Sequence, residues 1–213
     1  MNFLAHLALA RAHSEATSFH LGAMLPDFLS MAELRLREVV DPVVASGVRF
    51  HRATDSAFHD GPAFGELLGE ARRELASADV SVGCRRAATH VGIELLLDGW
   101  LARDAVLCAS FHATLRSAPA TDSRLFAHWE LDGGHRRWSD FRTRLAGDGL
   151  PEGYADLDVL AARLERILAR RPRLVLDAPA RRVVRAWLRR ARPRVEKRAE
   201  ELLAPARRVA GPG

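Results

Sequence analysis

Apolar positions recur every three or four residues along most of the chain, which is the spacing of one face of an α-helix. The pattern predicts helices over residues 2–12, 42–58, 64–76, 82–108, 136–145, 156–169 and 180–203. A turn over 18–25 is predicted to lead into a short helix with Pro26 in its first turn, and 33–40 forms a further amphipathic segment. Alternating runs of β-branched residues are scarce, so no sheet is predicted.

Weaker signals complete the all-α prediction. Residues 118–153 are rich in turn formers but allow a short helix over 125–130, and 111–116 continues the long helix that ends at 108. The last helix is expected to kink or break at Pro193, which lacks a backbone donor. We therefore predict one all-α domain over residues 1–203, followed by a disordered tail over 204–213.

Side chains that can bind metal stand four residues apart just before Gly61 and Pro62, a pair that ends helices. His51, Asp55 and His59 have this spacing, which places them on one helix face. This first ladder of imidazole, carboxylate and imidazole is the most distinctive polar pattern in the chain.

A second ladder consists of His90, Glu94 and Asp98, and the residues between its rungs are mostly apolar. Buried carboxylates are costly unless they are paired or bind a metal. A single ladder of this kind is common on a solvated helix face, but two ladders facing each other would make a metal site inside a helical bundle. The pair of ladders favours the metal site.

Composition narrows the class of protein. The chain has 213 residues, of which 48% are hydrophobic, as is typical of a globular domain. Cys84 and Cys108 lie in apolar helical patterns without a CxxC motif, so we expect buried thiols in a reducing compartment. The net charge of +5 is carried almost entirely by arginine, with Lys197 as the only lysine, and favours acidic partners modestly.

The N-terminal apolar run has no basic region before it, and His6 interrupts it. It is also far shorter than the ~20 residues that span a bilayer. We therefore predict a cytoplasmic protein without a membrane span, with His6 facing inward from a first core helix.

Three motifs follow one another in the N-terminal third. They are Met-Asn-Phe-Leu-Ala-His-Leu at 1–7, Leu-Gly-Ala-Met-Leu-Pro-Asp-Phe at 21–28 and His-Arg-Ala-Thr-Asp-Ser-Ala-Phe-His-Asp at 51–60. In order and spacing they resemble the motifs of the acyl carrier protein phosphodiesterase family. Beyond Pro62 the resemblance is limited to the second ladder and the helical pattern.

The resemblance implies a helical bundle like that of HD phosphohydrolases and a divalent metal, with manganese (Mn2+) favoured and iron or zinc as alternatives. It also implies hydrolysis of the phosphodiester that joins 4'-phosphopantetheine to a serine of holo acyl carrier protein. The partner would then be an acidic protein, for which the arginine-rich helices could form a docking face.

The resemblance and the two ladders together assign the candidate site residues. The expected metal ligands are Asp27, His51, Asp55, His90 and Glu94. Arg52 is expected to bind a phosphate oxygen, His6 and His59 to donate a proton to the departing serine oxygen, and Asp60 and Asp98 to support substrate or ligands.

The second ladder departs from the family pattern. Glu94 stands where the family has histidine, and Ile93 stands where it has aspartate. Ala23 and His59 replace an asparagine and a threonine of the other motifs. His90 lies one turn before Glu94 and could supply the imidazole that the family has at that place.

Other interpretations remain open. Arg52 can instead pair with Asp55 or Glu94, and His6 can be a hydrogen-bonded core histidine. A second class of function is an HD-like phosphohydrolase acting on a nucleotide or small phosphoester. A third is a non-catalytic helical protein that binds an acidic partner; nucleic acid is an unlikely partner because no recognition-helix motif is present.

Overall fold

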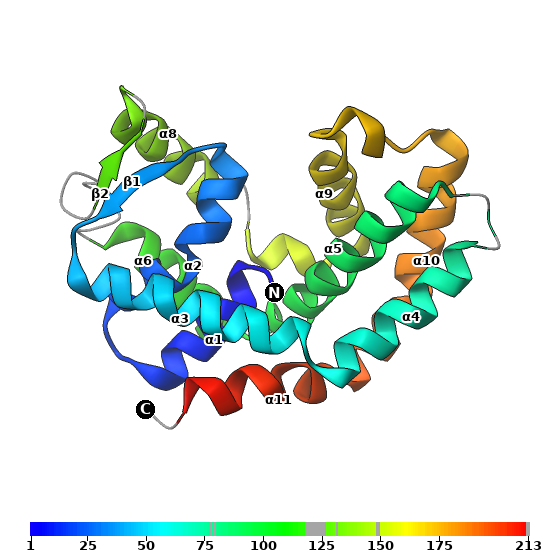
Figure 1. The fold of residues 1–213 in the computed structure, drawn as a ribbon, viewed down its shortest axis with the longest axis horizontal. Coiled ribbons are helices and arrows are strands. Elements are labelled where there is room, and N and C mark those ends of the chain that lie inside the picture. The colour runs from blue at the N-terminus through cyan, green and yellow to red at the C-terminus, as the bar shows by residue number, and fades with distance from the viewer. Residues whose placement is uncertain (77, 79, 118–126, 131, 148–149, 212–213) are drawn as a thin grey trace.

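Helices make up most of the computed structural model, which describes residues 1–76, 78, 80–117, 127–130, 132–147 and 150–211 (Figure 1). The α-helices are α1 (Phe3–His13), α2 (Thr17–Ala32), α3 (Pro42–His59), α4 (Pro62–Ala76), α5 (Val82–Leu101), α6 (Ala105–Arg116), α8 (Gly134–Gly147), α9 (Leu157–Ala169), α10 (Ala178–Lys197) and α11 (Ala199–Ala210). Two short 3-10 helices, η2 (Glu152–Ala155) and η3 (Pro172–Leu174), flank α9. The predicted all-α class is confirmed.

Aspartates fix where several helices begin. Asp41, Asp104 and Asp156 each accept hydrogen bonds from two backbone N–H groups in the first turn that follows, in α3, α6 and α9 respectively. These groups have no partner within the helix, so each cap stabilises the start by about 1 kcal/mol. The cap at Asp104 also corrects a prediction, because α5 ends at Leu101 and the apolar run through Cys108 is divided between two helices.

Pro26 and Pro193, like Pro205 in α11, lie within helices rather than at breaks. Pro26 lies inside α2, so the predicted turn and the short helix after it form one continuous helix. Pro193 lies inside α10, and the chain breaks only at Arg198. Each proline removes one hydrogen bond, but buried neighbours such as Leu25 and Phe28 hold the helix in place.

The prediction that the chain has no sheet is wrong. β1 (Leu36–Val39) pairs antiparallel with β2 (Ala127–Trp129), with Leu36 opposite Trp129. The strands occupy the predicted amphipathic segment 33–40 and the described part of the helix expected over 125–130. This pairing joins segments far apart in the sequence, which helical periodicity cannot reveal.

The predicted disorder of the tail is wrong for residues 204–210, which form the second half of α11. Ala206 is fully buried there, with Leu202 and Leu203 on the same helix. Burial of this apolar face supplies the order that composition alone does not indicate.

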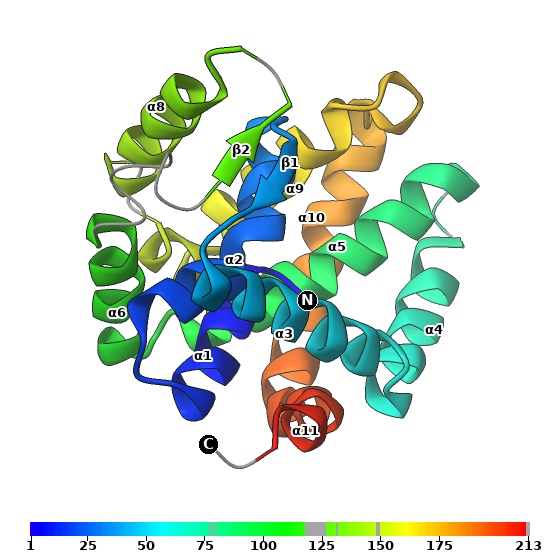
Figure 2. The same ribbon diagram turned by 60° about the vertical axis from the view of Figure 1, so that its left-hand side comes forward.

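The N-terminus lies in the middle of the molecule, close to α3 and α5 in both views (Figures 1 and 2). Aromatic packing holds the first turn of α1 there. The ring centroid of Phe3 is 5.7 Å from that of Phe28 in α2, 5.3 Å from Phe111 in α6 and 5.8 Å from Tyr154 in η2. Four elements therefore meet around one buried side chain.

Helices α2 and α3 cross with their backbones in contact. A Cβ atom on Gly22 would lie 2.2 Å from the carbonyl oxygen of Val44, and one on Gly47 would lie 2.3 Å from that of Phe19. No side chain fits at those separations, so glycine is required at both positions. The crossing brings His51 of α3 within hydrogen-bond distance of the backbone of Ala23 in α2.

We expect Gly47→Ala to lower the free energy of unfolding by about 1–3 kcal/mol, because the new methyl group would force the two helices apart. Gly65→Ala is the matched control, because Gly65 lies in α4 with open space around its Cα. There alanine should be neutral or stabilise by up to about 1 kcal/mol. Urea unfolding measures both, and equal stabilities for the two variants would contradict the close crossing.

Candidate metal centre

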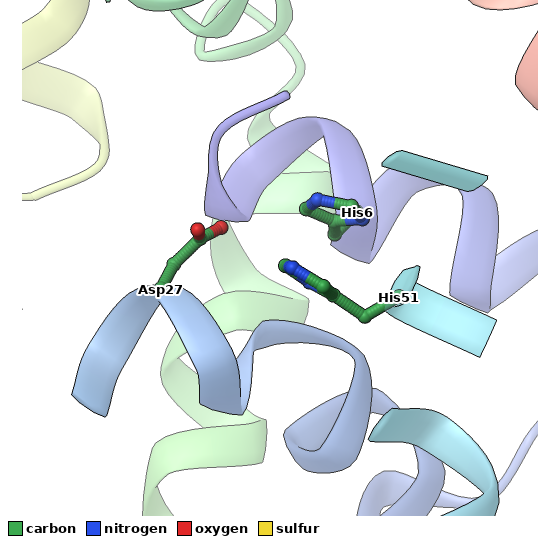
Figure 3. Close-up of side chains that lie close together, drawn as sticks. All are labelled: His6, Asp27 and His51. Atoms are coloured by element: carbon green, nitrogen blue, oxygen red, sulfur yellow. The ribbon is translucent and has the colours of Figure 1, made fainter. Parts of the chain in front are cut away.

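Three side chains from three helices form a first group of possible metal ligands. They are His6 of α1, Asp27 of α2 and His51 of α3, and one ligand atom from each lies within 4.8 Å of the other two. Figure 3 shows the two imidazole rings face to face, with the carboxylate of Asp27 directed toward them. The ring centroids of His6 and His51 are 3.8 Å apart, and both side chains are buried.

The backbone of α2 orients His51. Its Nδ1 lies 2.8 Å from the carbonyl oxygen of Ala23, and a carbonyl can only accept a hydrogen bond. Nδ1 is therefore the protonated nitrogen, and the lone pair of Nε2 is free to bind a metal. Histidine ligands commonly donate their second ring nitrogen to a carbonyl in this way.

Two polar atoms of the first group have no hydrogen-bond partner in the described structure. They are Nε2 of His6 and Oδ2 of Asp27, and both are buried. An unsatisfied buried polar group costs about 1–3 kcal/mol, so native proteins rarely keep one without a purpose. A cation between these residues would satisfy both atoms, and the donor set therefore fits a divalent metal.

Burial also sets the charges of this group. It lowers the pKa of His6 to about 3, so the imidazole is neutral at physiological pH, as a metal ligand must be. Burial raises the pKa of Asp27 well above its ordinary range, so that without a metal the carboxyl group tends to keep its proton. A bound cation would displace that proton.

A second group consists of His59, at the end of α3, with His90 and Glu94 of α5. Oε1 of Glu94 lies 2.8 Å from Nε2 of His59 and 3.1 Å from Nε2 of His90. The two imidazole rings stack with centroids 4.8 Å apart. The fold therefore brings the two sequence ladders together, but divides their residues between two groups.

Asp55 lies between the groups. Its Oδ1 is 3.6 Å from Nε2 of His6, and its Oδ2 is 3.3 Å from Nδ1 of His59. Burial favours the protonated form of Asp55, but the neighbouring His59 and His6 and the ammonium of Met1 outweigh it and hold the pKa of this carboxyl below its usual range. For His59 burial lowers the pKa, but the carboxylates of Asp55 and Glu94 outweigh burial and raise the pKa to about 9.

The α-amino group of Met1 also enters this network, which the two ladders do not indicate. It donates a hydrogen bond to Oδ1 of Asp55 at 2.5 Å and lies 3.4 Å from Oε1 of Glu94. The position of this ammonium depends on how α1 packs. The opening motif indicated that residues 1–7 matter, but neither periodicity nor a motif could predict that the amino group of Met1 would contact Asp55.

Asp98 is fully buried but belongs to neither group. Its two carboxylate oxygens accept hydrogen bonds from the backbone N–H groups of Leu4 and Ala5, at 3.2 and 3.0 Å. Asp98 of α5 thus holds the start of α1, which carries Met1 and His6. Burial raises its pKa to about 7, although the two backbone donors oppose this shift.

Arg52 and Asp60 are both exposed, and the described residues show no ion pair between Arg52 and either Asp55 or Glu94. Asp60 caps the end of α3 and lies 3.5 Å from the hydroxyl of Ser56. His20 hydrogen-bonds the carbonyl of Ser14 and lies outside both groups.

A groove of about 520 Å³ lies between α2, α3 and β1, the first two of which carry Asp27 and His51. Pro26, the neighbour of Asp27, and Arg52, the neighbour of His51, both line it. Leucines and valines from the same elements form its apolar part, and Arg35 and Arg37 add positive charge. Glu38 and Glu130 also line it, so the groove combines apolar surface with three arginines and two glutamates.

Much of the arginine run of α10 is paired within the chain. Arg194 forms an ion pair with Glu74 of α4, at 2.5 Å, and Arg185 pairs with Glu165 of α9 at 2.7 Å. At the junction with α11, Arg198 pairs with Glu66 of α4 at 2.8 Å. These pairs leave less of the helix free for an acidic partner than the sequence indicates.

No helix in the described part of the chain is long and apolar enough to cross a membrane. The described cysteines, Cys84 and Cys108, are both free and buried, as predicted.

Comparison with known families gives one result. A family model described as acyl carrier protein phosphodiesterase matches residues 1–203. Comparisons with curated proteins and with solved structures found no match.

We expect Asp98→Asn to change how stability depends on pH in metal-free protein. Between about pH 4 and 7 the folded protein holds a proton on Asp98 that the unfolded chain has released. The free energy of unfolding of the wild type should fall, relative to that of D98N, by up to about 1.4 kcal/mol per pH unit as pH rises through this window. Urea unfolding at several pH values measures the difference, and parallel curves would contradict it.

Proposed function

We propose that this chain, which belongs to the acyl carrier protein phosphodiesterase family, is a metal-dependent hydrolase of holo acyl carrier protein. The reaction would be hydrolysis of the phosphodiester between 4'-phosphopantetheine and the carrier's serine. Water attacks phosphorus, the bond from phosphorus to the serine oxygen breaks, and the products are apo carrier and free 4'-phosphopantetheine.

The observation that carries the proposal is the first ligand group, in which His6 and Asp27 each present a buried polar atom without a partner. Two imidazoles and one carboxylate suit manganese, iron or zinc, and three protein ligands leave room for water and substrate. His6 is a ligand in this proposal rather than a general acid, because an imidazole with a pKa of about 3 is neutral at physiological pH and lacks the acidic proton of an imidazolium.

The ion, when bound, would lower the pKa of a coordinated water and neutralise charge on the phosphate oxygens. His51 would hold it with Nε2, since Nδ1 is occupied by the carbonyl of Ala23. Asp98 fixes the start of α1 and with it the position of His6. Asp55 orients His59 through Nδ1, and its other oxygen lies 3.6 Å from Nε2 of His6, the atom that would face the ion.

Substrate binding would use the groove between α2, α3 and β1. Arg52 would bind a phosphate oxygen through its guanidinium, because its exposed side chain lines the groove and belongs to the same helix as His51. The apolar part would receive the pantetheine arm. The three arginines of the groove outnumber Glu38 and Glu130, and Arg35 and Arg37 would attract the acidic carrier. The buried free thiols are consistent with a cytoplasmic location.

We predict that His51→Ala and Asp27→Ala each reduce cleavage of holo carrier at least about 100-fold in the presence of manganese, because each removes a ligand. His112→Gln is the control, since His112 lies outside both ligand groups and forms an ion pair with the exposed Glu152. Mass spectrometry of the carrier follows loss of the 4'-phosphopantetheine group. Undiminished cleavage by both alanine variants would exclude this ligand group, and no cleavage by wild type at any metal concentration would exclude the substrate.

We predict that Arg52→Gln slows cleavage about tenfold to a hundredfold, because it removes one or two charge-assisted hydrogen bonds to phosphate. Arg52 is exposed and forms no ion pair with the described ligands, so the fold and the metal content should not change. Arg49→Gln, one turn away on α3, serves as the control for loss of a positive charge. Equal rates for the Arg52 and Arg49 variants would rule out a specific phosphate contact.

A further inference from the structure

We propose that His59, His90 and Glu94 hold a second divalent metal, so that the site is a two-metal centre with Asp55 between the ions. The inference rests on the proposed function, because the second ion would act on the same phosphodiester. It differs from the expected single site, in which ligands from both ladders surround one ion.

The first support is the convergence of ligand atoms. Nε2 of His59 and Nε2 of His90 lie 2.8 and 3.1 Å from the same oxygen of Glu94. Ligand atoms bound at about 2.1 Å to one ion are separated by about 3.0–3.4 Å. Glu94 is thus already spaced from both histidines nearly as it would be around a metal, and all three ligand atoms lie within 4.8 Å of one another. Two histidines with one glutamate are a common catalytic zinc set.

The second support is the orientation of the histidine rings. Nδ1 of His59 lies 3.3 Å from Oδ2 of Asp55, and Nε2 faces Glu94 at 2.8 Å. Without a metal both ring nitrogens face carboxylates and Nε2 donates a proton to Glu94, so a bound cation would take the place of that proton. A carboxylate on the far nitrogen is the usual way to orient a histidine ligand. Phe64 of α4 packs its ring against both imidazoles, with centroids 5.0 Å from His59 and 5.2 Å from His90, and restricts their rotation.

The third support is the link between the groups. The two oxygens of Asp55 face a histidine of each group, His6 on one side and His59 on the other. The α-amino group of Met1 lies at the same place, in contact with Asp55 and near Glu94, so these carboxylates already attract positive charge. A carboxylate shared in this way is suited to two ions that act on one phosphate.

Access from solvent fits a role with substrate. The side chains of His59 and His90 are 26% and 40% exposed, whereas His6 of the first group is fully buried. His59, His90 and Glu94 would hold an ion on the side more open to solvent, where its positive charge would be available to the departing serine oxygen; that oxygen would take its proton from water. This replaces the proton donation that the sequence suggested for His59.

The test counts manganese in the full-length protein after equilibrium dialysis, by elemental mass spectrometry, and records its electron paramagnetic resonance spectrum. We expect two manganese ions per chain in the wild type, with a spin-coupled spectrum. His90→Ala should hold one ion with an uncoupled six-line spectrum. The fold should be kept, because the side chain of His90 is 40% exposed. His112→Gln, a histidine outside both groups, should keep two ions.

One manganese per chain in the saturated wild type, or two coupled ions in His90→Ala with normal circular dichroism, would overturn the two-metal centre. Asp27→Asn gives the complementary variant, in which the ion of the second group should remain. Cleavage of holo carrier is assayed on the same samples. A wild type that cleaves with a single ion would refute this inference alone, whereas one that binds two ions without cleaving holo carrier would refute the proposed function alone.

Discussion

The contact of two helix backbones determines where the candidate centre can form. Gly22 and Gly47 allow α2 and α3 to approach until a Cβ atom on either would overlap a carbonyl of the other helix. At this separation the carbonyl of Ala23 reaches Nδ1 of His51, and Asp27 follows one turn further along α2. A wider crossing would leave the imidazole without its acceptor and the carboxylate too far from the ring.

The second requirement is electrostatic. Carboxyl groups at 27, 55, 94 and 98 lie in or beside the core, where isolated negative charge is costly. Three kinds of surroundings are found for these four carboxyl groups. Asp98 accepts two backbone hydrogen bonds, Asp55 and Glu94 face histidines and the amino group of Met1, and Asp27 is left with an unsatisfied oxygen. Asp27 is therefore the carboxylate that most needs a cation.

Most of the helices could be predicted from the sequence because periodicity and aspartate caps are local signals. The strands could not, because Leu36 and Trp129 meet only through the fold, and neither could the order of α11, which depends on burial of its apolar face. The site shows the same division. Spacing of four residues correctly placed His51 with Asp55 and His90 with Glu94 on common helix faces, but it could not show that His6 joins His51 while His59 joins Glu94, since that depends on how three helices pack.

The central claim is that His6, Asp27 and His51 hold a divalent metal, and anomalous diffraction from crystals grown with manganese tests it most directly. The account predicts an anomalous peak at about 2.2 Å from Nε2 of His6, Nε2 of His51 and Oδ2 of Asp27. Ordered water bound to these atoms, with no anomalous peak among the three side chains, would contradict it.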